Sequence, residues 1–339
     1  MKKPLSAFIR EYSARNKNEA CSAVYSVTNS HGFMPSTEYF SKEVFSKDLS
    51  AYKIVKKGMI AYNPSRINVG SVAVQRAAEQ VIVSPLYVVF EVNEKELLPE
   101  YVSYFLHSDI GLAQIAMNTS GSVRDSLKFN ALQKIEINVY SVEEQRRVVD
   151  KLQRLEAIIL KKRKVLEKFE DLVKSQFIEM FGNPITNSQN RPTKLFIDVV
   201  KLQRGYDLPV QDRVEGVVPV YGSNGILSYH NDSRAEDGII TGRSGTIGKV
   251  YFCRGEFWPL NTTLYSVDKH GNNPVFLTAL LQFFDLSRFY NGTGVPTLNR
   301  NIVHKERIID IPRKEQDRFA AFVEQTDKSK IPYEMEVAA

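Results

Sequence analysis

The chain has 339 residues, too many for one ordinary hydrophobic core and enough for two domains. With 43% hydrophobic and 25% charged residues, it is neither a disordered nor a fibrous protein. No run approaches the roughly 18 apolar residues of a membrane span, and "MKKPLSAFIREY" lacks the apolar stretch of a signal peptide. The net charge of +6 favours a polyanion partner weakly. Cys21 and Cys253 are isolated, so we expect reduced thiols and a cytoplasmic protein without membrane contact.

Residues 1–141 predict a strand-rich first domain. The stretch "IVSPLYVVFEV" at 82–92 is rich in β-branched and aromatic residues and predicts strand, whereas "PEYVSYFLHS" at 99–108 predicts a helix. Gly, Asn and Ser mark the loops between such runs. Because strands and helices do not alternate regularly, the pattern favours an α+β domain over a parallel α/β one.

Residues 142–182 predict one long helix. This segment has no Gly or Pro before Gly182, and Pro184 follows as a stop signal. At about 1.5 Å per residue the helix would be roughly 60 Å long. Its apolar residues alternate at steps of four and three, as in a coiled coil, with Lys162 and Gln176 interrupting the stripe. The stripe predicts a partner helix, and its members are Val148, Leu152, Leu155, Ile159, Leu166, Phe169, Val173 and Met180. Packing along a single domain is the alternative.

Residues 183–312 predict a second strand-rich domain, which the polar link "GNPITNSQNR" connects to the long helix. A second helix begins within 313–339, in "KEQDRFAAFVEQTDKSK". We expect it to be truncated at about 17 residues, because Pro332 should stop it. It would then cover less than half of the apolar stripe. The remainder, from Leu166 to Met180, is expected to be exposed in a monomer and covered by a second chain or a partner subunit.

The two domains are predicted to be copies of one unit. When Ser126 is aligned with Thr297, "SLKFNALQKIEINVYSVEEQRR" lies over "TLNRNIVHKERIIDIPRKEQDR" at one constant offset. Further upstream, "KKGMIAYNPSRINVGSV" is similar to "EDGIITGRSGTIGKV" at a drifting offset. The aligned identities include Leu127 with Leu298, Asn130 with Asn301, Lys134 with Lys305, Ile137 with Ile308, Glu144 with Glu315 and Gln145 with Gln316. The sequence therefore predicts a tandem duplication, each copy ending in a helix that opens with Glu-Gln.

Enzyme motifs are incomplete. In "GRSGTIGKV", a phosphate-binding loop would require Gly in place of Arg243 and Ser or Thr in place of Val250. The same stretch misses the nucleophile pattern G-x-S-x-G by one position. The five histidines are scattered, and the Asn-Pro-Pro-aromatic motif of amino-methyltransferases does not occur. We therefore predict no catalytic residues, no metal site and no cofactor for this chain.

Gly-punctuated loops with polar and basic residues are the candidate DNA contacts. Small residues let a backbone approach phosphates, hydroxyl and amide groups bind phosphate oxygens, and Arg can pair with guanine. One such loop occurs in each copy, and a further basic segment ends each copy. Structural surface turns are the alternative. The predicted DNA-binding residues are Arg66, Asn68, Arg124 and Lys128 in the first copy and Tyr221, Ser223, Asn224, Arg243, Ser244, Thr246, Lys249 and Arg300 in the second.

These features resemble the DNA specificity subunits of type I restriction-modification systems. The resemblance rests on the tandem layout, on "PVYGSNGILSYH", "GRSGTIGKVYF" and "WPLNTTLY", and on the helix that opens with "EEQRRVVDKLQRLEAII". It implies two target-recognition domains that each read half of a bipartite double-stranded DNA site. It also implies two long helices that pair as a coiled coil and dock two methyltransferase subunits, which in turn can recruit a motor-nuclease subunit.

The resemblance further implies that the chain is not itself a catalyst and that S-adenosylmethionine binds to the partner methyltransferases. The short second helix departs from the family pattern and puts an intrachain coiled coil in doubt. Self-association through the central helix is one resolution. A non-catalytic scaffold, or a truncated variant that binds partner protein without completing an enzyme, is the alternative function.

Overall fold

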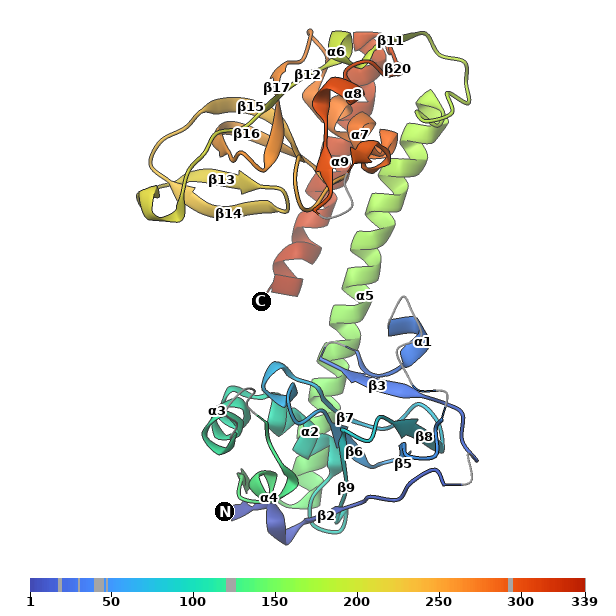
Figure 1. The fold of residues 1–339 in the computed structure, drawn as a ribbon, viewed down its shortest axis with the longest axis vertical. Helices are drawn as coiled ribbons and strands as arrows, with labels where there is room; N and C mark the ends of the chain where they lie inside the picture. The colour runs from blue at the N-terminus through green and yellow to red at the C-terminus, as the bar shows by residue number, and fades with distance from the viewer. Residues whose placement is uncertain are drawn as a thin grey trace. The chain divides into compact units, whose positions relative to one another are not determined.

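The computed structural model describes residues 1–17, 20–29, 31–39, 46, 48–119, 126–291 and 295–338. The chain divides into two compact units, Met1–Ile158 (unit 1) and Ile159–Ala339 (unit 2). Helix α5 (Val142–Phe181) begins in unit 1 and ends in unit 2 without a break (Figure 1). Ser141 starts this helix by donating both its N–H and its hydroxyl to Glu144, which lowers the pKa of that carboxyl. The predicted long helix is thereby confirmed.

Unit 1 is built around a four-stranded antiparallel sheet. The strand order is β2-β9-β6-β7, with bounds Ile9–Glu11, Val88–Val92, Ile60–Tyr62 and Val72–Val74. Two further pairs are β3 (Tyr25–Thr28) with β4 (Gly32–Pro35) and β5 (Lys53–Lys56) with β8 (Gln80–Val83). The helices are α1 (Ser36–Tyr39), α2 (Pro99–His107), α3 (Asp109–Asn118) and α4 (Phe129–Leu132). Two 3₁₀ turns, η1 (Leu5–Ala7) and η2 (Ile67–Val69), complete the unit.

Unit 2 contains a six-stranded sheet in the order β12-β17-β15-β16-β13-β14. The bounds of these strands are Lys201–Arg204, Thr263–Asp268, Ala235–Gly242, Val250–Pro259, Val218–Gly222 and Gly225–His230. A small pair joins β18 (Tyr290–Asn291) to β19 (Thr297–Leu298). The helical elements are α6 (Phe196–Val199), η3 (Val210–Asp212), α7 (Pro274–Phe284), η4 (Leu286–Phe289), α8 (Arg300–Val303) and α9 (Arg313–Ala338).

The two units share one topology, which confirms the predicted duplication. The order β2-β9-β6-β7 in unit 1 corresponds to β12-β17-β15-β16 in unit 2. In unit 1, β1 (Lys2–Pro4) pairs with β10 (Glu136–Asn138), and in unit 2, β11 (Thr193–Leu195) pairs with β20 (Arg307–Ile309). Ile137 and Ile308 occupy the same register position in these pairs, at the offset found in the sequence.

A buried glutamine fixes the start of the final helix in each unit. Gln145 Oε1 accepts from Leu98 N at 2.9 Å, and its Nε2 donates to the carbonyls of Glu96 and Tyr140. Gln316 repeats the arrangement, since its Oε1 accepts from Asn273 N at 2.8 Å and its Nε2 donates to Ile311 O. Each glutamine thus ties a helix to the residue that precedes the Pro at the start of α2 or α7.

The end of α5 is held in unit 2 by a phenylalanine cluster. Phe177 and Phe181 are fully buried, and both rings contact Phe276 of α7 and Phe319 of α9 at centroid distances of 5.2 to 5.9 Å. The expectation that Leu166–Met180 is exposed in a monomer is therefore wrong for Val173 and Met180, which pack against this core. The chain covers this end of the helix with its own second unit.

At the start of α5, the buried face also differs from the predicted apolar stripe. Val148 and Leu155 are exposed, whereas the neighbouring Val149 is buried. The buried face there follows Gln145 and Val149, because the polar anchor sets which side of the helix faces the unit. Leu152, Ile159, Leu166 and Phe169 are half-buried. A partner helix for the exposed positions remains a prediction.

Helix α9 does not stop at Pro332. It extends from Arg313 to Ala338, 26 residues, and it is still shorter than the 40 residues of α5. A proline in a helix costs one hydrogen bond and bends the turn before it, but a helix can continue past such a kink. The predicted truncation at about 17 residues was therefore wrong.

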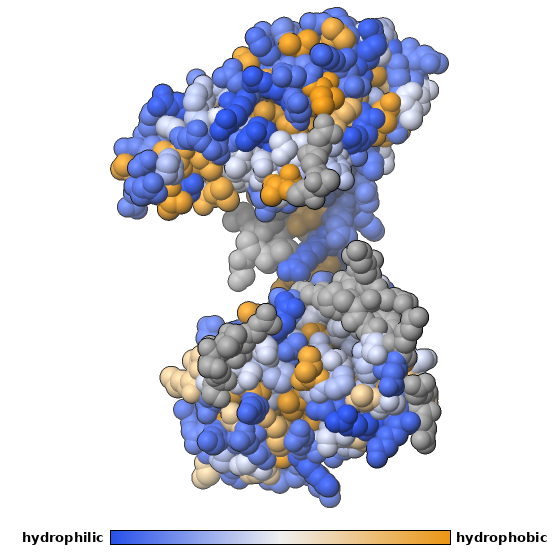
Figure 2. All heavy atoms as spheres, viewed as in Figure 1, coloured by the Kyte–Doolittle hydropathy of each residue, from blue (hydrophilic) through white to orange (hydrophobic). Residues whose placement is uncertain are grey.

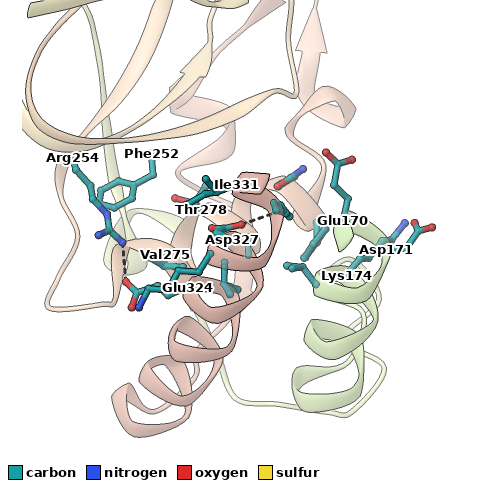
Figure 3. Close-up of a pocket in the computed structure, with 17 residues that line it drawn as sticks. Glu170, Asp171, Lys174, Phe252, Arg254, Val275, Thr278, Glu324, Asp327 and Ile331 are labelled. Atoms are coloured by element: carbon teal, nitrogen blue, oxygen red, sulfur yellow. Dashed lines mark hydrogen bonds and ion pairs between the residues drawn. The ribbon is translucent and has the colours of Figure 1, made fainter. Parts of the chain in front are cut away.

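A groove of about 1150 Å³ lies between α5 and α9 in unit 2 (Figure 3). Its apolar lining includes Val173, Phe252 and Val323. Two ion pairs lie at the groove, from Arg254 to Glu324 at 2.8 Å and from Lys330 to Asp327 at 2.9 Å. Within the described residues, no helix is long and apolar enough to cross a membrane.

Candidate nucleic-acid interface

In unit 2, the loop between β15 and β16 is the centre of the predicted DNA surface. It is fastened on both sides by its backbone. Arg243 N and Ser244 N donate to Thr262 O at 2.8 and 3.1 Å, and Arg243 O accepts from Leu298 N at 2.8 Å. Gly245 N donates to Pro296 O at 3.1 Å. The loop is thus held rigidly against residues 296–298, which lie far from it along the chain.

Two glycines let this loop turn back on itself. A Cβ on Gly242 would clash with the carbonyl oxygen of Thr246, so no other residue fits there. Gly245 has φ +89°, in the left-handed region that favours glycine. Its Cβ position also lies 3.4 Å from Ser223 Oγ. The predicted Ser223, Ser244 and Thr246 are therefore brought to one place.

The turn of hairpin β13–β14 supplies Ser223 and Asn224, whereas Lys249 ends the loop between β15 and β16. Lys249 Nζ donates to Asn224 Oδ1 at 2.7 Å, and both side chains are exposed. Arg243 is half-buried, and its Nε donates to Asn261 O at 2.8 Å. Arg243 therefore both supports the loop and leaves its terminal nitrogens for other partners. Six of the predicted residues therefore form one polar, basic surface in unit 2: Ser223, Asn224, Arg243, Ser244, Thr246 and Lys249.

Tyr221 is a correction to the predicted set. Its side chain is 8% exposed and packs among Ile240, Cys253 and Phe257. Burial, together with a hydrogen bond to the Cys253 thiol, raises the pKa of Tyr221. Both Val220 and Tyr221 are buried because the strand is covered on both faces, which the expected surface-loop position does not allow. Tyr221 is a core residue.

Arg300 opens α8 and is half-buried. Its positive charge and that of Lys201 both act on the imidazole of His304. Burial, followed by the charges of Arg300 and Lys201, holds the pKa of His304 below its usual range. Lys201 was missed by sequence reasoning because its position as the first residue of β12 carries no motif.

A pH effect follows from His304. Its Nε2 accepts from Leu202 N at 3.1 Å, which requires a neutral ring nitrogen. Because the folded pKa is lowered, the stability contribution is present above the unfolded value of about 6.5 and is lost as pH falls through the folded pKa. We expect His304→Gln to lose less stability than wild type between about pH 7 and pH 5. Urea unfolding followed by the fluorescence of Trp258 gives the free energy of unfolding at each pH. If that free energy fell equally with pH in wild type and in His304→Gln, the prediction would be contradicted.

The equivalent loop of unit 1 lies between β6 and β7. It is fastened at the same place, since Leu127 N donates to Pro64 O at 3.0 Å as Leu298 N does to Arg243 O. Pro64 and not Arg66 therefore occupies the position of Arg243. Arg66 and Asn68 are exposed at the turn η2, and Lys128 is exposed directly after Leu127. Arg124 lies outside the described residues.

Arg288 is a further candidate that the sequence did not reveal. It follows Ser287, whose Cβ lies 3.3 Å from the Cβ position of Gly248 in the loop. Its guanidinium is exposed and stacks on Phe284 and Phe289 at 4.6 and 4.7 Å. The loop and Arg288 are far apart in sequence, so only the fold brings them together. In the described part of the chain, no three His, Cys, Asp or Glu residues gather as metal ligands would.

Known proteins resemble this chain in part of its sequence and in its fold. Residues 12–170 match the family model of the type I restriction modification DNA specificity domain. The fold matches the S subunit of the type I restriction-modification system of M. genitalium, with a TM-score of 0.59 and 13% identity over 100% of this chain and 92% of that one. Residues 12–170 therefore belong to the type I restriction-modification DNA specificity family. The matched segment covers most of unit 1 and part of α5, and unit 2 repeats the same strand order.

Two further solved structures match this chain. One, from work on complex assembly and conformational transition of the type I R-M system, has a TM-score of 0.48 and 13% identity, over 100% of this chain and 95% of that one. The HsdS subunit from Thermoanaerobacter tengcongensis has a TM-score of 0.40 and 14% identity, over 99% and 90%. No curated protein matches the chain.

Proposed function

We propose that the chain reads a bipartite double-stranded DNA site, with one half recognised by each unit. The observation that carries this is the equivalence of the two loops. Each loop follows the equivalent strand, β6 in unit 1 and β15 in unit 2. Each is also fastened by an equivalent backbone hydrogen bond, from Leu127 N to Pro64 O and from Leu298 N to Arg243 O. A duplicated rigid loop with exposed polar and basic groups is suited to contacting DNA twice.

The chemistry of the unit 2 surface supports DNA as the ligand. Lys249 and Arg288 offer cationic groups for phosphates, whereas Ser244, Thr246 and Asn224 offer neutral donors and acceptors. An exposed amide or guanidinium on a fixed loop can read a base edge, because fixed geometry distinguishes donor and acceptor patterns. The different residues in the unit 1 loop are expected to select a different half-site.

We further propose that the chain acts within a type I complex, in which two methyltransferase subunits dock and a motor-nuclease subunit can join. Helix α5 supports this role because it leads uninterrupted from unit 1 to unit 2 and keeps apolar side chains such as Leu155 and Leu160 exposed. Methyl transfer to a base requires that base to leave the stack, and S-adenosylmethionine would belong to the methyltransferase. In this assignment the chain supplies recognition and its partners supply chemistry.

Selection from a random duplex pool tests the proposal. The protein and its methyltransferase partner are mixed with the pool, and the retained DNA is sequenced. Enrichment of a two-part motif with a fixed gap is the expected result. Recovery of no motif, while the protein still binds its partner, would instead favour the scaffold function.

Lys249→Ala provides a residue-level prediction. Its side chain is exposed, so the fold should persist while one phosphate contact is lost. We expect weaker DNA binding and a salt slope, log K against log salt, reduced by about 1. Lys314→Ala is the matched control, because Lys314 is an exposed lysine at the start of α9. Equal losses for both variants would argue against a specific role for the loop.

A further inference from the structure

An apolar side chain lies beside the polar residues of the unit 2 surface. β14 is the edge strand of the six-stranded sheet and, within the described residues, pairs with β13 alone. It contains no Lys, Arg, Asp or Glu, and Ile226 is 48% exposed two residues after Asn224. Figure 2 shows apolar side chains gathered over β13 and β14 in this part of unit 2. The polar, basic surface defined above therefore borders an apolar one.

A β-bulge sets the direction of the Ile226 side chain. Tyr221 is paired with Ile226. The preceding residue of β13, Val220, is paired with Ser228, so Leu227 has no partner on that strand. Paired residues of two strands point to the same face of a sheet, and successive residues of one strand alternate. Ile226 therefore points to the face of Tyr221, whereas Ser228 points to the face of Val220. Such an extra residue re-aims a side chain, often beside a functional site.

The face of Tyr221 is also the face on which the hairpin meets the loop between β15 and β16. The rings of Tyr221 and Tyr251 lie 6.1 Å apart, so the start of β16 lies against this face. Two residues before Tyr251, Lys249 donates to Asn224 Oδ1 in the turn of the hairpin at 2.7 Å. A ligand that contacts Lys249 and Asn224 can therefore also reach Ile226.

The aliphatic side chain of Ile226 supplies a contact that the polar residues cannot make. Hydrogen-bonding groups distinguish bases by their donors and acceptors, whereas the C5 methyl group of thymine takes an apolar contact. Among the four DNA bases only thymine carries this methyl group, and it faces the major groove. A two-stranded β-ribbon is narrow enough to enter that groove. Single exposed apolar residues are common on protein surfaces, but Ile226 lies on the hairpin that presents Asn224.

We propose that Ile226 contacts the C5 methyl group of a thymine in the half-site read by unit 2, and that this contact favours thymine at one position. The inference rests on the proposed DNA reading and assigns one base to one side chain within it. Loss of a single buried methyl group weakens binding about fourfold. The contact involves no charge, so this factor should not change with salt, whereas a phosphate contact weakens as salt rises.

Deoxyuridine tests the proposal, because it pairs like thymidine but lacks the C5 methyl group. The full chain with its methyltransferase partner is bound to the two-part motif recovered from the duplex pool, and each thymine on either strand is replaced in turn. We expect one position at which deoxyuridine weakens binding by wild type about fourfold and does not weaken binding by Ile226→Ser. Ile226→Val keeps an aliphatic side chain and should retain most of the discrimination.

Ile185→Ser is the matched control, because Ile185 is an exposed isoleucine of unit 2 in the link after α5. This variant should discriminate like wild type. The inference fails alone if the motif contains no thymine, or if Ile226→Ser keeps every preference for thymine over deoxyuridine. Loss of all DNA binding by Ile226→Ser would indicate a structural role and would also overturn it. Failure to recover any two-part motif would overturn the proposed function, and this inference with it.

Discussion

Phe177→Ala is expected to destabilise unit 2 by about 3–5 kcal/mol, the usual cost of deleting a fully buried aromatic ring. The Phe177 ring contacts those of Phe181, Phe276, Phe283 and Phe319 at 5.0 to 5.9 Å, so its loss opens a cavity at the junction of three helices. Trp258 is the only tryptophan and is buried in unit 2, so its fluorescence during urea unfolding reports on this unit.

Leu172→Ala is the control for this change. Leu172 lies on the same helix but is 47% exposed, and we expect a loss of no more than about 0.5 kcal/mol. If both variants unfolded at the same urea concentration as wild type, the phenylalanine cluster would not be what attaches α5 to unit 2.

Gln316→Ala is expected to cost unit 2 about 3 kcal/mol, because several buried polar groups lose their partner together. The substitution removes bonds to Asn273 N, Ile311 O and the Asn272 side chain, at 2.6 to 2.8 Å. Each buried group left without a partner costs about 1–3 kcal/mol. Urea unfolding monitored through Trp258 measures the loss. In addition, the amide hydrogen of Asn273 should exchange faster.

Gln325→Ala is the matched control, since Gln325 is exposed on the same helix and should tolerate truncation. In unit 1, Gln145→Ala should accelerate exchange of the Leu98 amide in the same way. Protection of both amides in the variants would mean that the glutamines are not the anchors of the two helices.

The sequence predicted the duplicated architecture well because its signals are local or repeated. The aligned Ile137 and Ile308 occupy the same register position in their strand pairs. The aligned Gln145 and Gln316 accept equivalent backbone hydrogen bonds. The bounds of α5 also follow from local chemistry, a Ser-to-Glu capping box at its start and Gly182 at its end. Such features need no knowledge of distant contacts.

The candidate site could be predicted only in part. The loop 243–249 was recognisable by its glycines, but its fastening to residues 296–298 and its closeness to Arg288 depend on long-range contacts. Tyr221 was assigned wrongly because a Gly-rich, polar neighbourhood in sequence does not show that both faces of its strand are covered.

The surface of the molecule carries polar and apolar residues side by side on both units (Figure 2), so hydropathy alone does not mark the positions that bind. By itself the sequence determined the two copies, the α+β class and the uninterrupted helix between them. Only the tertiary structure decided which face of that helix is buried. A regular α-helix has 3.6 residues per turn, so a stripe of period 3.5 shifts around it, and contacts select Phe177 and Phe181 in place of Gln176. Likewise, burial of Gln145 selects Val149 over Val148. Apolar periodicity limits the choices, but the surfaces that meet the helix determine the outcome.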